Sequence, residues 1–285
     1  MIVAISGATG FIGQALRKKF REKEWEIRLI DRASLLLAEA EFTGKYIEDV
    51  DVVINLAGAP IAKKWTEDWK KEMRDSRILT TRKIAGSILA AKHKPSVFIS
   101  QSAIGIYDSV STHTETSTGF ASGFLADLCR DWEQEAMAAG QVTRLAIFRT
   151  GLVFGEDGGF LESLYFPFSI GFGGKIGKGR QSMSFIHLDD LVAAYFFTID
   201  HPSVSGIVNA TTPFPTTNAE FTDKFSKVLK QPAWLTVPEF ILKFRLGEGA
   251  EMLMEGQKVL PWKLEEAGFR FKYPTVQNAL VKIFS

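Results

Sequence analysis

The amino-acid sequence predicts an α/β fold, a doubly wound parallel sheet with a smaller C-terminal α/β lobe. Short apolar, β-branched runs alternate with longer stretches of helical periodicity, which is typical of helices covering both faces of a parallel sheet. A glycine-rich turn directly follows the first of these runs. The 285 residues, 46% hydrophobic and 24% charged, suffice for one large domain and an appendage. We expect residues 1–155 to form the sheet domain, completed by residues 185–210, and residues 156–285 to form the second lobe.

The glycine-rich turn lies between a predicted strand at residues 2–6 and a predicted helix that follows it, with glycines at positions 7, 10 and 13. In a Rossmann unit one glycine permits the turn, another lets the backbone approach a pyrophosphate, and a third lets the helix pack on the strand. The helix N-terminus adds unpaired N–H groups and the positive end of the helix dipole. The turn therefore predicts a dinucleotide site formed by Gly7, Thr9, Gly10, Phe11, Ile12 and Gly13.

The second predicted strand, Glu26 to Asp31, ends at the residues that choose between NAD and NADP, because this strand end touches the adenosine ribose in a Rossmann unit. Asp31 favours NAD, since a carboxylate accepts hydrogen bonds from a free 2′-hydroxyl. Arg32 favours NADP, since a guanidinium pairs with a 2′-phosphate. A charged pair that only closes an exposed strand end explains each residue equally well, so the residues alone leave the choice open.

Residues 33–50 are too few for a complete helix, strand and helix, so we expect an abbreviated third strand there. A buried strand then runs into a small-residue turn, where the predicted cofactor contacts are Asn55, Leu56, Ala57 and Gly58. A long helix is predicted from Thr66 to Lys92, with a buried stripe formed by Trp69, Met73, Ile78, Leu79, Ile84, Ile88 and Leu89.

Hydroxyl groups gather after the next predicted strand, at residues 96–100. Ligands of open α/β sheets bind at the carboxyl ends of the strands. Ser102 is therefore the first catalytic candidate, and Tyr107 is the second.

The chain continues with helices and strands in alternation. A helix predicted at residues 121–139 precedes a strand at 143–148, which leads to two further predicted cofactor contacts, Arg149 and Thr150. In the second lobe we expect a helix opened by an Asp190 cap, a strand at residues 207–209 and a helix that begins at Thr217.

Composition and charge argue against several classes of partner. The formal charge of +1 gives no reason to expect nucleic acid or an anionic membrane. We see no stretch of the ~20 apolar residues that a membrane span needs, and no targeting segment ahead of the first strand. Cys129 is the only cysteine and the four histidines lack metal-site spacing, so we expect no disulfide and no metal. We expect a cytoplasmic protein with a small-molecule substrate, and a homodimer stays open.

Several segments carry a resemblance to one family. They are the glycine turn and residues 55–61, 74–77, 124–133, 149–151, 179–181, 209–211, 217–221 and 256–261. From end to end the chain resembles the atypical extended short-chain dehydrogenase/reductases of the epimerase family, also called the NAD-dependent epimerase/dehydratase family, with a C-terminal domain of unknown function. The resemblance implies a sheet that binds NAD or NADP and a lobe that holds the substrate over the nicotinamide. It also places a phosphate-binding arginine at Arg32, so we favour NADP slightly.

The sequence departs from the wider superfamily at the catalytic pair. There the helix after the serine strand carries Tyr-x-x-x-Lys, a tyrosine acid/base and a lysine one helical turn later. The two positions fall on Leu125 and Cys129 here, and a shift of one residue gives Phe124 and Leu128. The usual proton shuttle is therefore missing in either alignment. Cys129 is interpreted as a small apolar residue rather than a reactive thiol.

Substitute acids are Tyr107, which ranks first, followed by Asp108, Glu115 and His187. Relatives that bind nucleotide sugars carry Gly-x-Gly-x-Gln-x-Arg ahead of an aspartate pair, and that arginine grips the sugar's pyrophosphate. This chain has Met183 in its place. We therefore expect a substrate other than a nucleotide-diphosphate sugar, with Arg180 and His187 as substrate contacts.

Two functions follow. The first is an NAD(P)-dependent oxidoreductase or epimerase that acts on a small substrate, with Ser102 polarising the reacting oxygen. The alternative is a non-catalytic dinucleotide-binding redox sensor or a scaffold linked to cell division, because the tyrosine and lysine of the usual pair are missing.

Overall fold

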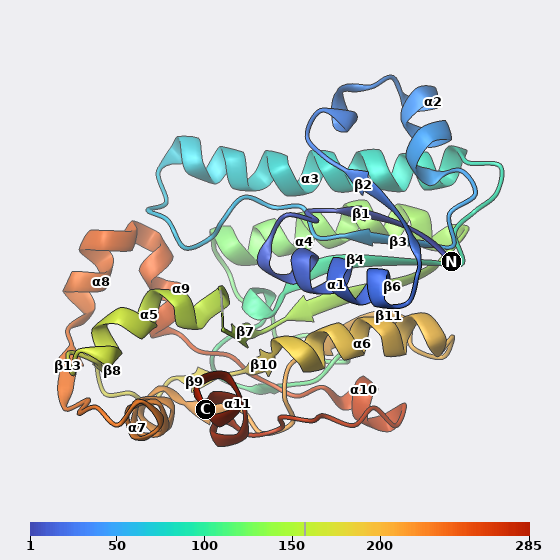
Figure 1. Ribbon diagram of the computed structural model, residues 1–285. Coiled ribbons are helices and arrows are strands. Elements are labelled where there is room, and N and C mark those ends of the chain that lie inside the picture. Colours follow the sequence, from blue (N-terminus) through green and yellow to red (C-terminus); the bar gives the residue numbers. More distant parts are fainter. Residues whose placement is uncertain (157) are drawn as a thin grey trace.

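The computed structural model describes residues 1–156 and 158–285, except the side chains at positions 239, 245 and 246. A six-stranded parallel sheet forms its centre, in the strand order β11-β6-β4-β3-β1-β2 (Figure 1). The chain order changes direction at β1, between β2 and β3, so the carboxyl ends of β1 and β3 form the switch point where such sheets bind ligands. The strands are β1 (Ile2–Ser6), β2 (Glu26–Ile30), β3 (Val52–Asn55), β4 (Val97–Ala103), β6 (Arg144–Thr150) and β11 (Gly206–Ala210).

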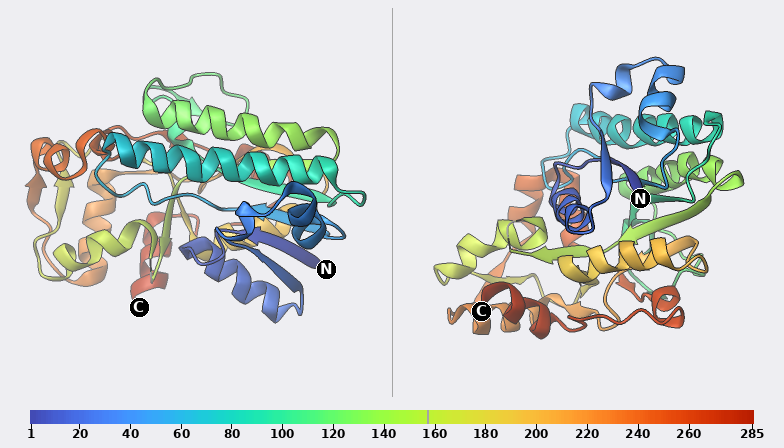
Figure 2. Two further views of the ribbon diagram at one scale, coloured as in Figure 1. Left: turned by 90° about the horizontal axis from the view of Figure 1, so that it is seen from above. Right: turned by 45° about the vertical axis from the view of Figure 1, so that its right-hand side comes forward.

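Helices cover both faces of this sheet. On one face α1 (Phe11–Glu22) and α6 (Leu188–Asp200) contact each other, and on the other face α3 (Glu67–Ala90) contacts α4 (Phe124–Met137), as Figures 1 and 2 show. This arrangement confirms the predicted doubly wound α/β fold.

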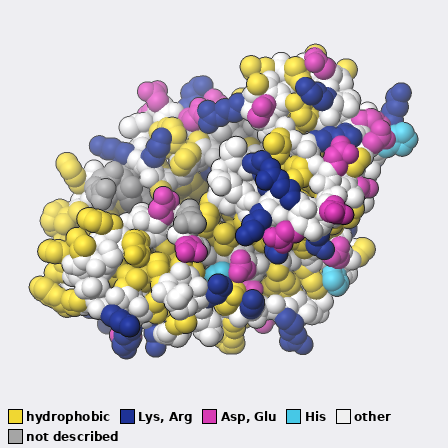
Figure 3. Space-filling model, viewed as in Figure 1, with side chains coloured by type: hydrophobic (Ala, Val, Ile, Leu, Met, Phe, Trp, Pro, Cys, Tyr) yellow, Lys and Arg dark blue, Asp and Glu magenta, His cyan; other side chains and the backbone are white. Residues whose placement is uncertain are grey.

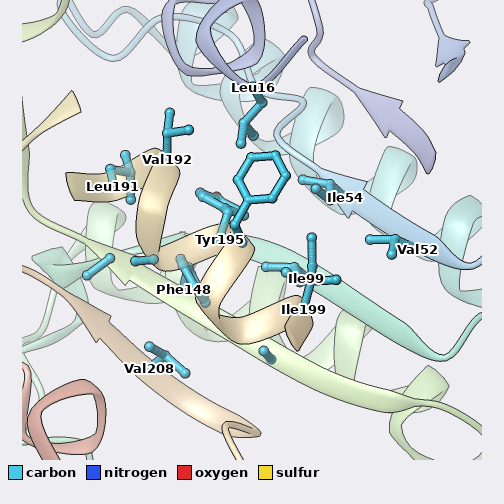
Figure 4. Packing of buried hydrophobic residues seen from close by; sticks show 14 of the residues in the cluster. Leu16, Val52, Ile54, Ile99, Phe148, Leu191, Val192, Tyr195, Ile199 and Val208 are labelled. Carbon is cyan, nitrogen blue, oxygen red and sulfur yellow. The ribbon is translucent and has the colours of Figure 1, made fainter. Parts of the chain in front are cut away.

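Successive residues of each strand enter two different cores, as the alternation of side chains in a strand requires. Val3 and Ile5 pack under α1 and α6, whereas Ala4 packs under α3. Figure 4 shows the first core, in which the rings of Phe148 and Tyr195 lie 4.5 Å apart. Both faces of the sheet are therefore buried, which explains the nearly continuous apolar runs in its strands.

The C-terminal lobe is built from pairs of short strands and from helices. The pairs are β7 (Leu152–Gly155) with β10 (Phe185–His187), β8 (Gly174–Ile176) with β13 (Leu235–Val237), β9 (Ser182–Met183) with β12 (Thr216–Thr217), and β14 (Lys258–Val259) with β5 (Thr112–His113). The helices are α5 (Gly159–Ser169), α7 (Asn218–Leu229), α8 (Glu239–Leu246), α9 (Glu251–Met254), α10 (Trp262–Glu266) and α11 (Val276–Phe284). Aromatic rings dominate the core of this lobe, and those of Phe154 and Phe185 stack at 4.7 Å.

The prediction of a short strand within residues 33–50 was wrong. Those residues, all of which the structure describes, form a 3₁₀ turn (Ser34–Leu36), α2 (Glu39–Phe42) and a π-helical turn (Thr43–Ile47). Phe42 and Ile47 are fully buried beside α3. A helical connection therefore takes the place of the predicted strand and buries these two side chains.

The predicted buried stripe of α3 was correct only in part. Met73, Ile84 and Ile88 are buried, but Leu79 and Leu89 are 53% and 40% exposed. α4 and the turns of residues 34–47 cover one side of α3, and the two leucines lie outside that contact.

The predicted Asp190 cap was also wrong. α6 begins two residues earlier, at Leu188, and the ring nitrogen Nδ1 of His187 accepts the N–H of Asp189 at 3.1 Å. Asp190 is buried, and its carboxylate accepts the backbone N–H groups of Lys272 and Tyr273, each at 2.8 Å. Asp190 thereby ties the segment before α11 to α6.

The surface of the lobe carries many exposed aromatic side chains. Figure 3 shows hydrophobic side chains gathering over the lobe, and the exposed aromatic residues there include Phe166, Phe172, Trp234, Phe240 and Phe244. Among the described residues, no helix has both the length and the apolar character needed to cross a membrane.

We expect Asp190→Ala to lower the free energy of unfolding by about 2 to 4 kcal/mol, because two buried N–H groups lose their charged acceptor. The matched control is Asp189→Ala, whose side chain is 60% exposed and whose loss should cost about 1 kcal/mol or less. Urea denaturation followed by tryptophan fluorescence measures both. Equal effects of the two substitutions would contradict the assignment.

Candidate functional site

A cavity of about 470 Å³ opens at the switch point, between the sheet and the lobe. The glycine turn and the loop after β3 supply Gly7, Gly10, Phe11, Ile12, Gly13 and Leu56. The carboxyl ends of β4 and β6, together with α4, supply Gln101, Ala103, Ile104, Gly105, Leu125 and Thr150. The lobe closes the cavity with residues that include Phe160, Gln181, Met183, Asn218, Leu253 and Gln257.

The backbone packs closely at the glycine turn. Gly7 has a φ of +67°, and a Cβ there would lie 2.6 Å from the carbonyl oxygen of Leu56. A Cβ on Gly13 would lie 2.3 Å from the carbonyl oxygen of Gly7. Side chains at these two positions would therefore separate β1, α1 and the β3 loop.

Gly10 differs from the other two glycines. It is the N-cap of α1, it makes no side-chain cap, and a Cβ there would meet only the Gly7 carbonyl oxygen, at 3.3 Å. The first N–H groups of α1, on Phe11, Ile12 and Gly13, have no acceptor within the helix. Thr9 is exposed at the same turn and lies outside the cavity lining, with its carbonyl accepting Gln14 Nε2 at 2.8 Å.

The ring of Phe11 connects the turn to the lobe. A Cβ on Gly155 would lie 2.5 Å from an atom of that ring, and a Cβ on Gly158 would lie 2.6 Å from one. A Cβ on Gly159 would lie 2.7 Å from the ring and 2.5 Å from the Val153 carbonyl oxygen. Gly155, Gly158 and Gly159 therefore leave room for the ring of Phe11.

Asn55 positions the β3 loop from beneath. Its side chain is fully buried, and Oδ1 accepts Ser6 Oγ at 2.6 Å and the Ala57 N–H at 3.3 Å, while Nδ2 donates to Thr81 Oγ1 at 2.7 Å. Of the four residues predicted at this loop, only Leu56 lines the cavity. Asn55, Ala57 and Gly58 form its support.

Sequence reasoning missed the role of Arg77 in α3. Its guanidinium is buried under Gly58, where a Cβ would lie 2.8 Å from Cζ of Arg77. It donates to the carbonyls of Met73 and Ala59, and burial lowers its pKa to about 10. Arg77 thus fixes the loop, and only the clustered arginines of residues 74–77 hinted at this.

Asp31 and Arg32 lie at the carboxyl end of β2. Asp31 Oδ1 accepts the Ser34 N–H at 2.8 Å and so opens the following turn. The Arg32 side chain is 88% exposed, and one guanidinium nitrogen lies 3.8 Å from Glu72 Oε1. The carboxylate is engaged locally, whereas the guanidinium projects into solvent.

A buried polar network lies behind the cavity and includes three predicted site residues. Ser102 Oγ donates to Glu133 Oε1 at 2.7 Å, and Arg149 pairs with both oxygens of Glu133 at 2.7 and 2.8 Å. Arg149 also donates to the Tyr107 hydroxyl at 2.8 Å, and that hydroxyl donates to Asn209 Oδ1 at 3.0 Å. Burial raises the pKa of Tyr107.

Strand alternation explains why Ser102 of β4 and Arg149 of β6 do not line the cavity. Gln101 and Ala103 of β4 face it, and Ser102 between them faces the network. Gln101 is held in place because its Oε1 accepts the hydroxyl of buried Tyr195 at 2.5 Å. Sequence reasoning did not single out Gln101 as a cavity residue, although the alternation of side chains along the strand was the available signal. The catalytic roles of Ser102 and Tyr107 stay predictions.

The two positions of the missing catalytic pair are both apolar. Leu125 lines the cavity and packs against Gly105, where a Cβ would lie 2.5 Å from Leu125 Cδ2. Cys129 is 1% exposed, and burial raises the pKa of its thiol to about 12. These surroundings support its interpretation as a packing residue.

The two predicted substrate contacts lie outside the cavity lining. Arg180 is exposed, and His187 is buried as the cap of α6, with its ring centroid 4.2 Å from that of Tyr273. Burial lowers the pKa of His187 to about 4. Met183, in contrast, is buried and lines the cavity, and Asn218 Nδ2 donates to its sulfur at 3.7 Å.

One group of potential metal ligands, which spacing did not suggest, lies at the amino end of the sheet. His93 Nδ1 is 3.0 Å from Glu48 Oε1 and from Asp49 Oδ1. The Glu48 carboxylate already accepts the backbone N–H groups of Lys92 and His93. The group is largely exposed and contributes nothing to the cavity.

Comparisons with known proteins agree with this geometry. A profile of the NAD dependent epimerase/dehydratase family matches residues 3–210, and one of a domain of unknown function (DUF1731) matches residues 237–283. The chain is 37% identical over 297 residues to the chloroplastic epimerase family protein SDR39U1 homolog of Arabidopsis thaliana, covering 98% of this chain and 86% of that one. It is 39% identical over 291 residues to an epimerase family protein of Mycobacterium leprae, covering 98% and 94%.

Among solved structures, human epimerase family protein SDR39U1 (isoform 2) with NADPH superimposes with a TM-score of 0.92 at 31% identity, covering 99% of each chain. The Thermus thermophilus UDP-glucose 4-epimerase complex with NAD has a TM-score of 0.77 at 17% identity, covering 100% and 99%, and shows the fold alone. The fold is thus that of the NAD(P)-binding short-chain dehydrogenases and epimerases. Within that class, this chain belongs to the NAD dependent epimerase/dehydratase family.

We expect Ser102→Ala to lower the free energy of unfolding by about 1 kcal/mol, the value of one buried hydrogen bond, and to leave dinucleotide affinity unchanged. Glu133→Gln should cost about 3 to 5 kcal/mol, because the buried Arg149 loses its charged partner. Urea denaturation and calorimetric titration measure the two effects. A folded Ser102→Ala protein without dinucleotide affinity would show that Ser102 contacts the ligand.

Proposed function

We propose that this protein binds NAD or NADP with the pyrophosphate on the amides of Gly10, Phe11 and Ile12. The observation that carries the proposal is the uncapped N-terminus of α1, which opens into the cavity where Gly7 and Gly13 allow close backbone packing. Among the described residues beyond its chain neighbours, only the Gly7 carbonyl oxygen, at 3.3 Å, lies near the Cβ position of Gly10, so a phosphate can approach the backbone there. A bound nicotinamide dinucleotide supplies hydride transfer.

We propose NADP in preference to NAD. Arg32 is exposed at the strand end that faces the adenosine ribose, and Asp31 is engaged with the Ser34 N–H. The human neighbour was solved with NADPH, which supports the same preference. The Thermus neighbour was solved with NAD, so the family fold by itself accepts either dinucleotide.

We propose that the protein is an oxidoreductase or epimerase whose small substrate occupies the cavity beside Gln101, Leu125 and Met183. The lobe encloses this part of the cavity, as expected of a site that excludes water during hydride transfer. The Ser102 side chain points from β4 to the side away from the cavity, so any contribution to catalysis passes through the position of Gln101.

A non-catalytic dinucleotide sensor or scaffold is the second candidate. One observation favours it, namely that none of the described residues that line the cavity is Asp, Glu, Lys, Arg, His, Tyr or Cys. Anaerobic mixing with reduced dinucleotide and a pool of metabolites separates the two functions. Loss of absorbance in the nicotinamide band supports the enzyme, and binding without such loss supports the sensor.

We expect Gly10→Val to reduce dinucleotide affinity by about a hundredfold or more, equivalent to about 2.7 kcal/mol, because the added side chain occupies the phosphate position. The fold should remain intact, because little lies near that Cβ. The control is Gly44→Val, where the Cβ would meet nothing within 4 Å. Calorimetry with both dinucleotides measures the change, and full affinity in a folded Gly10→Val protein would refute the site.

We expect Arg32→Ala to reduce NADP affinity by about tenfold while leaving NAD affinity unchanged, because the guanidinium pairs only with the 2′-phosphate. Asp31→Ser should raise NADP affinity, since it removes a repulsive charge. Arg270→Ala, at an exposed arginine in the C-terminal segment, is the control. Tighter binding of NAD than NADP by the parent, with Arg32→Ala inert, would contradict the preference.

A further inference from the structure

Among the residues that the structure describes, none that lines the cavity carries a charged side chain. Each of the residues at its wall is apolar, a glycine, an amide or a hydroxyl residue. The two arginines that the sequence predicts at the site do not line the cavity. Arg149 pairs with Glu133 in the buried network, and Arg180 is exposed outside the lining. Away from the backbone amides of the glycine turn, an anionic ligand would find no counter-charge on the described side chains of the wall, which is costly against an apolar surface.

The polar groups that remain are neutral. The Gln101 amide is held between Tyr195 and the backbone of β4, and Gln181 Nε2 donates to the carbonyls of Ile176 and Leu253. The other neutral polar residues that the lobe brings to the lining include Ser182, Asn218 and Gln257. Such groups recognise a ligand through one or two oxygen atoms and leave the rest of it against apolar wall.

The described residues of the lining also offer no side chain that releases a proton near neutral pH. The hydroxyls of Thr150 and Ser184 donate to backbone carbonyls, and the tyrosine and lysine positions of the superfamily hold Leu125 and Cys129. A simple ketone that accepts hydride becomes a strongly basic alkoxide and needs a proton donor at once. A conjugated acceptor spreads the same charge over several atoms and does not.

We propose that the cavity takes an uncharged, conjugated carbonyl compound, of which a quinone is the type. The proposal rests on the proposed function and specifies its ligand. In the overall reaction a hydride, carrying two electrons and one proton, passes from the reduced nicotinamide, which is thereby oxidised, to the ligand, and a proton from water completes the reduced product. The chain's own contribution is an apolar wall and neutral hydrogen-bond donors for the developing oxyanion.

The test compares two probes with the same ring system, uncharged 2-methyl-1,4-naphthoquinone and anionic 1,4-naphthoquinone-2-sulfonate. Each is titrated calorimetrically into the protein saturated with oxidised NADP, so that binding is measured without turnover. Because the single cysteine, Cys129, is 1% exposed, addition of quinone to a thiol does not confuse the measurement. We expect the neutral probe to bind at least tenfold more tightly.

Variants place a charge in the wall. Met183→Arg should shift the preference at least tenfold towards the sulfonate, because it supplies the missing cation. Leu253→Lys, at a half-buried position of the same wall, tests the same effect if Met183→Arg does not fold. Lys178→Ala, which removes an exposed cation from the neighbouring segment, should change neither affinity.

The outcomes distinguish a wrong ligand class from a wrong proposed function. Equal or tighter binding of the sulfonate by the parent protein, or binding of neither probe, overturns the ligand class while leaving dinucleotide binding intact. Failure of oxidised NADP to bind in a titration without quinone overturns the proposed function instead. With NADPH in place, formation of one hydroquinone for each NADPH consumed provides a further supporting result.

Discussion

The close contact of three backbone segments at Gly7 is the constraint on which the rest of the site depends. The turn after β1, the start of α1 and the loop after β3 approach so closely that a Cβ on Gly7 or Gly13 would overlap a neighbouring carbonyl. Because no side chain separates them, the N-terminus of α1 reaches the switch point of the sheet. Asn55 and Arg77 then hold the β3 loop from beneath, and the floor of the cavity consists largely of backbone.

The sheet divides polar from apolar surroundings through the two directions of its side chains. On β4, Gln101 and Ala103 face the cavity while Ser102 joins Glu133 and Arg149 behind it. The Arg149–Glu133 ion pair and its hydrogen bonds satisfy one another's donors and acceptors there. They therefore stabilise the strand ends without placing charge in the cavity. On β4 and β6 it is register that keeps Ser102 and Arg149 out of the cavity lining, since a shift of one residue would exchange the two faces of each strand.

Features determined by neighbouring residues were predictable from the sequence, and features determined by distant ones were not. The glycine turn, the strands other than the one expected within residues 33–50, and the helix starts at Thr66 and Thr217 depend on local patterns, and the structure contains each of them. Asp190 was misassigned because its partners lie 82 and 83 residues away. Ser102 was chosen from its position after a strand, but which face it occupies depends on the helices packed on either side. The exposure of Leu79 likewise depends on how far α4 reaches along α3.

The C-terminal segment forms part of the cavity wall. A Cβ on Gly256 would lie 1.8 Å from the carbonyl oxygen of Ser182, and Ser184 Oγ accepts the Val259 N–H at 2.9 Å. The segment that carries Gln257 therefore packs directly on the strand that carries Met183, and together they form the wall opposite the glycine turn. The Thermus neighbour at 17% identity and the human neighbour at 31% identity both superimpose over at least 99% of this chain, lobe included, with TM-scores of 0.77 and 0.92. The lobe is therefore part of the shared fold, as the sheet is, and its packing brings Met183 and Gln257 to the wall of the cavity.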